Sequence, residues 1–250
     1  MTESLHITTY NIHKGFSNFN RRMVLHEVRD QLRHLKSDLI FLQEVHGAHD
    51  GHGLRHENYP VMPQYEFLAD SVWSEFRYGK NAVYDEGHHG NAILSRFPII
   101  SSENEDVSAH AFENRGLLHC VIAIPGWKEW LHAVCVHLGL TVRGRRKQIE
   151  MMCDRIDRMV PPESPLVIAG DFNDWQQGAS RVLRARLQVR EVFEMTRGRP
   201  ARSFPASFPL LRLDRIYVRG VRVGQTRLLT GQQWARLSDH SALSARVSPI

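Results

Sequence analysis

Short apolar runs of strand length recur from one end of the chain to the other, and this pattern constrains the fold more than any other feature of the sequence. Most of these runs are too short for ordinary helices and are bounded by Gly, Pro, Asn or Asp, which is typical of strands. The predicted strands are residues 5–10, 38–42, 65–69, 91–94, 117–124, 130–136, 166–169, 212–218, 221–229 and 241–247. A continuous apolar run such as DLIFL has no polar face, so other parts of the chain must cover it on both sides.

Helices are predicted in fewer places. Apolar residues recur every three or four positions at 24–35 and at 149–159, and a shorter helix is predicted at 181–187. Residues 46–64, which are rich in Gly, His, Asn and Pro, predict a long loop. No repeat or shift in composition marks a domain boundary. We therefore expect a single α/β domain over residues 1–250, with a two-sheet core and helices outside it.

Charge and cysteine content bear on the partners and the compartment. The formal net charge of +5 and the excess of Arg over Lys fit a phosphate-bearing substrate, although mild basicity also serves solubility alone. Cys120 and Cys135 lie in predicted strands and Cys153 lies in a predicted helix, so buried free thiols and a reducing compartment are expected. No signal-peptide pattern and no membrane-spanning apolar run is present. We therefore expect a cytoplasmic monomer without a transmembrane segment.

Residue types that bind metals or move protons lie directly at the ends of the apolar strands. Asn11, Glu44, His137 and Asp171 each follow a predicted strand, and Asp239 and His240 precede the last one. Strand ends gather at the rim of a sheet, so side chains that are far apart in the sequence can meet there. The sequence therefore predicts one site at a sheet rim, built from carboxylates, amides and imidazoles.

Each of these residues also has an ordinary structural interpretation. Asn11 and Asp171 could be turn residues, since Asn and Asp are favoured in turns. Glu44 could be a surface carboxylate, and His137 could be a hydrogen-bonded histidine at the end of a strand. For each residue taken singly the ordinary interpretation is the better one. The functional interpretation rests on their occurring together, in order, at successive strand ends.

Several short segments carry a more specific pattern. They are TYNIHKG (9–15), LQEV (42–45), GNAILSRFPI (90–99), VHLGL (136–140), VIAGDFND (167–174), LDRIYV (213–218) and LSDHSAL (237–243). In this order they resemble the endonuclease/exonuclease/phosphatase superfamily, which includes DNase I, the exonuclease III-type abasic endonucleases, the neutral sphingomyelinases and the inositol-polyphosphate 5-phosphatases. The GDFN and SDH elements are the most specific. The run YDEGHHGNAILSR (84–96) is similar to an uncharacterised bacterial group, the YbhP-like proteins.

The resemblance implies a fold and a metal. The fold is a four-layer α/β/β/α sandwich of two mainly antiparallel mixed sheets, as in DNase I. The metal is Mg²⁺ or Mn²⁺, with Glu44 as its principal ligand and with Asn11 and Asp239 completing its surroundings. Hard cations of this kind prefer carboxylate oxygen and keep several waters, so few protein ligands suffice.

The same resemblance implies catalytic roles. His240 would be the general base that takes a proton from the attacking water, and Asp214 would orient its ring and stabilise the imidazolium. Asp171 and Asn173 would hold the nucleophile and the phosphoryl oxygens. His137 would donate to a phosphoryl oxygen or protonate the leaving group.

Two further residues are assigned to the substrate phosphate, Arg115 in ENRGLL and Asn91 in GNAILSR. A solvated charge at the start of a strand explains Arg115 nearly as well. The carboxylate partner that the DNase I resemblance implies for His137 is not evident in the sequence, where Glu86 is the candidate.

The reaction implied by this set is divalent-metal-dependent hydrolysis of a phosphoric ester, by in-line attack of water on phosphorus. The expected substrate is nucleic acid, or a phospholipid or another small phosphodiester. Two alternatives stay open: a non-catalytic phosphate- or nucleic-acid-binding module on the same fold, and a phosphomonoesterase. The sequence favours the enzyme because the predicted metal and base residues are all present.

Other polar and aromatic clusters have two interpretations each. The histidines of residues 46–56 could bind Zn²⁺, but a polar loop beside the site is the favoured interpretation. The pair at 88–89 and Lys14 could contact an anionic substrate or belong to an ordinary polar surface. The aromatic residues of 70–79 could stack on bases, touch lipid or pack in the core.

Overall fold

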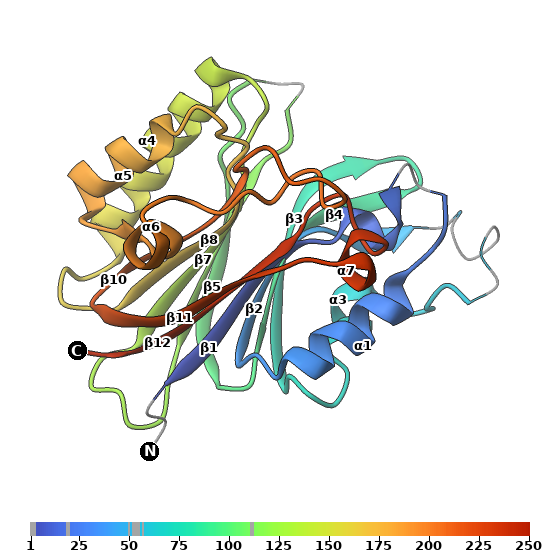
Figure 1. Ribbon diagram of the computed structural model, residues 1–250, viewed down its shortest axis with the longest axis horizontal. Coiled ribbons are helices and arrows are strands. Elements are labelled where there is room, and N and C mark those ends of the chain that lie inside the picture. The colour runs from blue at the N-terminus through green and yellow to red at the C-terminus, as the bar shows by residue number, and fades with distance from the viewer. Residues whose placement is uncertain (1–3, 19–20, 50, 52–55, 57, 111–112) are drawn as a thin grey trace.

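Two β-sheets packed face to face form the centre of the molecule, and helices cover the outer face of each (Figure 1). The structure is a computed structural model that describes residues 4–18, 21–49, 51, 56, 58–110 and 113–250. The layer order of helix, sheet, sheet and helix confirms the predicted four-layer α/β/β/α fold. Every helix in the described ranges falls short of the combined length and apolar character that crossing a bilayer requires.

The first sheet has six strands in the order β11-β12-β1-β2-β4-β3. In chain order they are β1 (Leu5–Asn11), β2 (Leu39–His49), β3 (Glu75–Tyr84), β4 (Gly87–Ser95), β11 (Val221–Leu229) and β12 (Ala242–Pro249). β1 and β2 are parallel and the other neighbours are antiparallel. The helices that pack on its outer face are α1 (Leu25–Leu35), α3 (Gln64–Ala69) and α7 (Gln232–Ala235), and the short 3₁₀ helix η1 (His13–Gly15) follows β1.

The second sheet also has six strands, in the order β5-β6-β7-β8-β10-β9. They are β5 (Ile99–Asp106), β6 (Gly116–Ile122), β7 (Leu131–His137), β8 (Leu166–Asp171), β9 (Arg190–Glu191) and β10 (Asp214–Arg219). β7 and β8 are parallel, and the other neighbours are antiparallel. The helices on this side are α4 (Val142–Met159) and α5 (Gly178–Leu187), with α6 (Val192–Arg197) packed against β10 and β11.

One parallel pair in each sheet brings strand ends to a common rim. Asn11 at the end of β1 is paired with Gln43 of β2, and His137 at the end of β7 is paired with Asp171 of β8. β10 runs antiparallel to β8, so its first residue, Asp214, lies opposite Asp171. A hydrogen bond from Asn11 to Asp171 joins the two sheets at this rim.

An apolar core fills the space between the sheets. The inner face of the first sheet contributes side chains such as Phe41 and Ile93, and the inner face of the second contributes Ala133 and Val167, all fully buried. The burial of this apolar area is the main driving force for stacking one sheet on the other. All three cysteines are buried and unpaired, as predicted from their places in apolar runs.

Two secondary-structure predictions are wrong. Residues 65–69, predicted as a strand, lie in the helix α3, which begins directly after Pro63. A short apolar run does not distinguish a strand from a buried helical turn, whereas a proline at a helix start is common. Residues 46–49, predicted as part of a loop, continue β2 and pair with β4 across a register irregularity.

The sequence pattern does not predict β3 or β5, and both are edge strands. β5 is exposed over most of its length, so its polar residues hide the alternation that marks a half-buried strand. In the aromatic segment 70–79, Trp73 is buried and donates its indole N–H to the Ser37 carbonyl at 3.0 Å, which favours the core interpretation. Among residues 46–56, His52 and the side chain of His49 lie outside the described part, and the described side chains of this segment form no group with metal-ligand spacing.

Candidate active site

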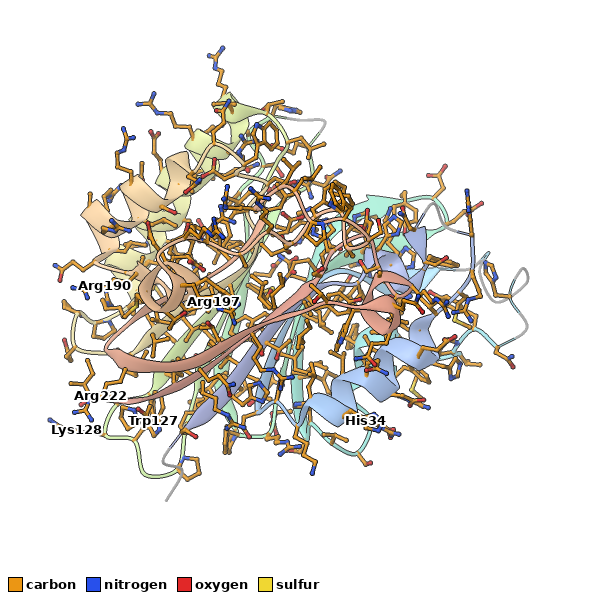
Figure 2. The ribbon with its side chains drawn as sticks, in the orientation of Figure 1. His34, Trp127, Lys128, Arg190, Arg197 and Arg222 are labelled. Atoms are coloured by element: carbon orange, nitrogen blue, oxygen red, sulfur yellow. The ribbon has the colours of Figure 1, made fainter. Side chains whose placement is uncertain are left out.

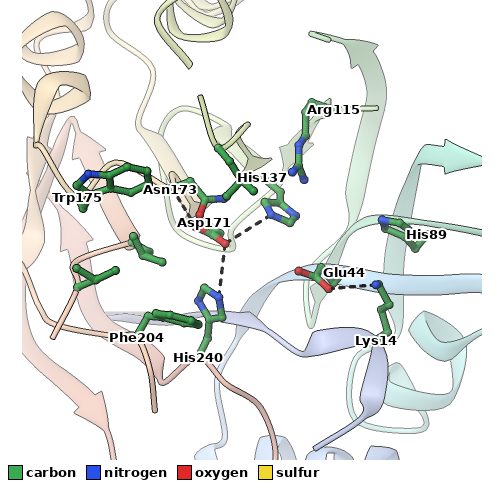
Figure 3. Close-up of a pocket in the computed structure, with 13 residues that line it drawn as sticks. Lys14, Glu44, His89, Arg115, His137, Asp171, Asn173, Trp175, Phe204 and His240 are labelled. Atoms are coloured by element: carbon green, nitrogen blue, oxygen red, sulfur yellow. Dashed lines mark hydrogen bonds and ion pairs between the residues drawn. The ribbon is translucent and has the colours of Figure 1, made fainter. Parts of the chain in front are cut away.

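Side chains from both sheets meet at the rim where β1, β7 and β8 end and where β2 passes through Glu44 (Figure 3). Asn11 links the sheets, because its Nδ2 donates to Oε1 of Glu44 at 3.2 Å and to Oδ2 of Asp171 at 3.2 Å. The loop before β12 is tied to the same place, because Ser238 Oγ donates to the Asn11 carbonyl at 2.7 Å. The structure therefore brings together residues that lie far apart in the sequence, including His240 two positions after Ser238.

A break in the pleat of β2 turns Glu44 toward the rim. Ile40 and Leu42 point to the outer, helix-covered face, and regular alternation would place residue 44 there too. The register with β4 shifts between Leu42 and Val45, and Val45 takes the outer position instead. Glu44 has a φ of 55°, a conformation uncommon for a residue other than glycine, and its side chain lines a pocket. Such local strain is often found where a side chain has a functional orientation.

The Glu44 carboxylate is ionised at neutral pH. Burial would raise its pKa, but His137 when protonated, Lys14 and the amide of Asn11 oppose burial and lower the pKa of Glu44 to about 2. Burial, with the charge of Arg115 adding to it, holds the pKa of His137 well below its usual range, so that ring is neutral near pH 7. Lys14, whose Nζ lies 3.9 Å from Oε2, Asn11 and the charged ring of His240 are therefore the neighbours that stabilise the charged carboxylate.

His240 and Asp214 form a buried, hydrogen-bonded pair. Nδ1 of His240 lies 2.8 Å from Oδ2 of Asp214, and both side chains are almost fully buried. Burial alone would lower the pKa of His240, but the carboxylates of Asp214 and Asp171 outweigh it and raise that pKa to about 10. The pair fixes the ring so that Nε2 points toward Asp171, at 3.7 Å from Oδ2.

Asp171 is the common neighbour of both histidines. Its Oδ2 lies 3.5 Å from Nε2 of His137, while its Oδ1 accepts the backbone N–H of Asn173 at 2.9 Å. Burial raises the pKa of Asp171 to about 6, Asp214 adds to the rise, and His240 opposes it. The Asn173 side chain donates to the Leu138 carbonyl at 3.0 Å, which holds the turn after β8 in place. The carboxylate next to His137 is therefore Asp171, whereas Glu86 is in the turn between β3 and β4.

A pocket of about 430 Å³ with two unlike ends is lined in its middle by Glu44, His137, Asp171, Asn173 and His240. The polar end is lined by Lys14, His89 and Arg115, and the apolar end by Leu140, Trp175, Phe204, Leu211 and Leu213. Figure 3 shows Trp175 and Phe204 on one side of Asp171, and Lys14, His89 and Arg115 on the other. A ligand in this pocket would meet positive charge at one end and apolar surface at the other.

The aromatic wall is held by specific contacts. The guanidinium of Arg145 lies 4.6 Å from the centre of the Trp175 ring, and its Nη1 donates to the Leu140 carbonyl at 2.6 Å. The rings of Phe204 and His240 are 5.0 Å apart. The sequence analysis did not single out Trp175 or Phe204. The one signal that could have found Trp175 is its place directly after the GDFND segment, whereas Phe204 carries no such signal.

The sequence profile of the Endonuclease/Exonuclease/phosphatase family matches residues 8–240, which is most of the chain. The chain belongs to the endonuclease/exonuclease/phosphatase family. Members of this family are generally hydrolytic enzymes that act on phosphate esters.

The chain is also similar to individual proteins, in sequence to one and in fold to others. The uncharacterised protein YbhP of Escherichia coli K12 is 49% identical over 244 residues, which cover 98% of this chain and 96% of that protein. A functionally unknown conserved protein from Enterococcus faecalis V583 has a TM-score of 0.78 at 19% identity, covering 98% of this chain and 100% of the other. The human nocturnin catalytic domain with a bound sulfate anion has a TM-score of 0.77 at 15% identity, covering 99% and 94%. The structural matches show a shared fold.

The donors at the rim fit the hard divalent cation typical of endonuclease/exonuclease/phosphatase family members. Glu44 is ionised and lines the pocket, so it offers a carboxylate to such a cation. Asn11 positions the carboxylates, because its Nδ2 donates to Glu44 and Asp171 while its Oδ1 accepts the backbone N–H of His13 at 3.1 Å. Asp171, Asp214 and His240 also offer three ligand atoms within 4.8 Å of one another. However, the hydrogen bond between Asp214 and His240 already occupies Nδ1 and one carboxylate oxygen. Glu44, whose charged carboxylate faces the pocket, could therefore serve as a ligand for such a cation.

Four residues predicted for the site are not among those that line the pocket: Asn11 and Asp214, which hydrogen-bond to lining residues, and Asn91 and Asp239. Asn91 is fully buried in β4, and its Nδ2 donates to the Gly116 carbonyl at 2.9 Å, because its position in the strand faces the other sheet. Its amide nitrogen is thus engaged in joining the sheets, which does not support a phosphate contact. Asp239 is partly exposed in the loop before β12, where its Oδ1 lies 3.3 Å from Ser238 Oγ.

Proposed function

We propose that this chain hydrolyses phosphodiesters with the help of Mg²⁺ or Mn²⁺. The observation that carries the proposal is the buried hydrogen-bonded pair of Asp214 and His240. Nε2 of His240 is directed at Asp171, and both His240 and Asp171 line the same pocket as the ionised Glu44. An imidazole oriented by a carboxylate beside a hard-cation site is the arrangement that activation of water requires. A non-catalytic binding module has no need of it.

Glu44 would hold the cation, with Asn11 and Asp239 beside it. A bound divalent cation would polarise a phosphoryl oxygen, offset negative charge that grows in the transition state, and lower the pKa of His240 toward neutrality. Asp239 lies one residue before His240, so its carboxylate stays close to this rim.

The remaining polar residues would bind and orient the reacting groups. With its pKa lowered, His240 takes the proton of the attacking water at Nε2, while Nδ1 stays hydrogen-bonded to Asp214. Asp171 orients that water between the two histidines. His137, neutral near pH 7, donates to a phosphoryl oxygen, and Arg115 binds the phosphate at the polar end of the pocket.

The apolar end of the pocket favours a diester over a monoester. Trp175 and Phe204 offer ring faces to a group attached to the scissile phosphate, either a base or an aliphatic chain. The sulfate in nocturnin, a tetrahedral anion like phosphate, supports phosphate binding on this fold. Nucleic acid and a phospholipid or other small phosphodiester both have such a group.

The test compares turnover of bis-p-nitrophenyl phosphate and p-nitrophenyl phosphate in Mg²⁺, in Mn²⁺ and in EDTA. We expect metal-dependent turnover of the diester, and loss of it in Glu44→Gln and His240→Gln with an unchanged melting temperature. Metal-dependent turnover of the monoester alone would favour a phosphomonoesterase. No turnover with either metal would favour a binding module. Parallel assays on single- and double-stranded DNA, RNA, phospholipids and inositol phosphates then identify the substrate, with Glu44→Gln as the blank.

A further inference from the structure

A second cavity, of about 330 Å³, lies outside the active-site pocket and is lined by arginines. They are Arg197, Arg199, Arg202 and Arg212. The other residues around it are apolar, and neither Asp nor Glu occurs among the described residues that line it. We call this cavity the arginine pocket. Four guanidinium groups around one small cavity repel one another at close range, and none of the residues that the structure describes around the cavity offers a carboxylate to offset this repulsion.

The arginine pocket and the active-site pocket share a wall. Leu211 and Leu213 line the active site, whereas Arg212 between them lines the arginine pocket. On the neighbouring stretch, which pairs with this one through Phe204 and Leu211, Phe204 lines the active site and Arg202 lines the arginine pocket. Successive residues of an extended chain point to opposite sides, so Arg212 points away from Leu211 and Leu213, and the two pockets lie on opposite faces of residues 211–213.

Two of the guanidinium groups are held in place by neutral partners. Arg197 at the end of α6 packs 5.3 Å from the centre of the Phe193 ring, and its Nη2 donates to the Thr226 carbonyl at 2.6 Å. Nε of Arg212 donates to the Pro200 carbonyl at 3.2 Å. Each guanidinium has five N–H donors, so both retain donors for a ligand. A positioned guanidinium loses less entropy on binding than a mobile one.

The positive charge of the arginine pocket is not neutralised by the protein. Within the described ranges, none of its four arginines forms an ion pair. Burial lowers the pKa of Arg212, and the charges of Arg202, Arg215 and Arg199 lower it further. An anion in the pocket would relieve this repulsion, and phosphate matches it best because guanidinium groups bind phosphate oxygens in pairs.

We propose that the arginine pocket binds a phosphate group at a site separate from the hydrolytic centre. A free phosphate anion and the backbone phosphate of a single-stranded nucleic acid present the same oxygens to the arginines. The site is a property of the arginine cluster and does not depend on the hydrolysis proposed above.

The test is isothermal titration calorimetry of the full chain in EDTA at fixed ionic strength. One probe is inorganic pyrophosphate and the other is a short single-stranded oligothymidylate. The pocket variant carries Arg199→Ala and Arg202→Ala, two exposed side chains. The matched control carries Arg190→Ala and Arg222→Ala, which remove the same charge from exposed sites outside the pocket. Figure 2 shows Arg197 close to α6, and Arg190 and Arg222 nearer the edge of the molecule.

We expect the pocket variant to bind at least one probe about tenfold more weakly or worse, and the control to stay within about twofold of wild type. For the oligonucleotide, the plot of log K against log salt has a negative slope. Loss of two phosphate contacts should make that slope less negative by about 1.4, while the control keeps the wild-type slope. A loss confined to pyrophosphate assigns the site to free phosphate, and a loss confined to the oligonucleotide assigns it to nucleic acid.

Three results would overturn the proposal. They are equal losses in the pocket variant and the control, wild-type affinity in the pocket variant, and no binding of either probe by the wild type. Melting temperatures from circular dichroism show whether each variant is folded. If the alanine pair unfolds the chain, the Arg199→Gln and Arg202→Gln pair keeps the side-chain length and removes the same charges.

Discussion

Replacing Asp214 with asparagine removes the charge that faces Nδ1 of His240 and keeps the shape of the side chain. The two groups are 2.8 Å apart and buried. A unit charge about 4 Å from the imidazolium contributes about 4 kcal/mol at an effective dielectric constant of about 20, which equals about three pKa units. In EDTA, the pKa of His240 should therefore fall from about 10 to about 7 in Asp214→Asn.

The assay is an NMR titration of the protein labelled at the histidine Cε1 carbon, with His240→Gln to assign the signal. Asp239→Asn serves as the control, because it also removes a nearby carboxylate but does not break the hydrogen bond to Nδ1. We expect a smaller shift in the control than in Asp214→Asn. In the metal-dependent assay, Asp214→Asn should lower kcat by about 10³–10⁴-fold, the effect known for an asparagine that misorients a catalytic imidazole.

The reasoning would be refuted if the pKa of His240 moved by less than about one unit and kcat stayed within about tenfold of wild type. That pair of results would mean that Asp214 neither sets the charge of the ring nor orients it. A large pKa shift without loss of kcat would separate the two roles and remove His240 as the base.

Three other substitutions test the site and the fold. Burial raises the pKa of Glu191 to about 7, against the opposing effect of backbone N–H groups, so the folded state binds this proton more readily than the unfolded state and the free energy of unfolding falls as pH rises from 4.5 to 7. Urea unfolding at pH 5 and pH 8 should show that Glu191→Gln removes up to about 3 kcal/mol of this fall, and an unchanged difference between the two pH values would count against it. Trp175→Ala should raise KM for bis-p-nitrophenyl phosphate about tenfold with little change in kcat, because it removes a ring face from the pocket wall; a loss confined to kcat would contradict that role. A Cβ at Gly170, where φ is 149°, would lie 1.9 Å from the Val136 carbonyl oxygen, so Gly170→Ala should lower the free energy of unfolding by about 3 kcal/mol or more. Gly178→Ala is the control, because its Cβ would lie 3.9 Å from the nearest atom, Oδ1 of Asp174, and equal stability of the two variants would contradict this expectation.

The sequence was sufficient to predict the layers and the rim. β1 is buried along its whole length and β8 begins as a continuous apolar run, and Asn11 and Asp171 mark their ends in the sequence as well as in the structure. Because β1 and β8 belong to different sheets, the meeting of these two side chains depends on how the sheets stack. The family resemblance supplied that step, since composition and periodicity do not determine the stacking of sheets.

The rest depends on tertiary contacts that leave little trace in a single sequence. The orientation of Glu44 comes from a bulge in β2, which no local signal marks. Phe204 and Arg212 lie on one paired segment whose residues line two different pockets, and that division depends on the pairing of Phe204 with Leu211. For Asn91 the sequence carried a signal but the structure gives the residue another place. It belongs to the GNAILSR segment, yet its side chain faces the second sheet and its hydrogen bond to Gly116 joins the two sheets.

The central claim is that the ionised Glu44 carboxylate holds the divalent cation beside the Asp214–His240 pair. The most direct measurement is an anomalous difference map from a crystal soaked in Mn²⁺, with the Glu44→Gln variant treated in the same way. We expect one peak about 2.1–2.2 Å from the Glu44 carboxylate and facing Asn11, absent in the variant. A peak between Asp171, Asp214 and His240 that persists in Glu44→Gln, or no peak at this rim, would contradict the claim.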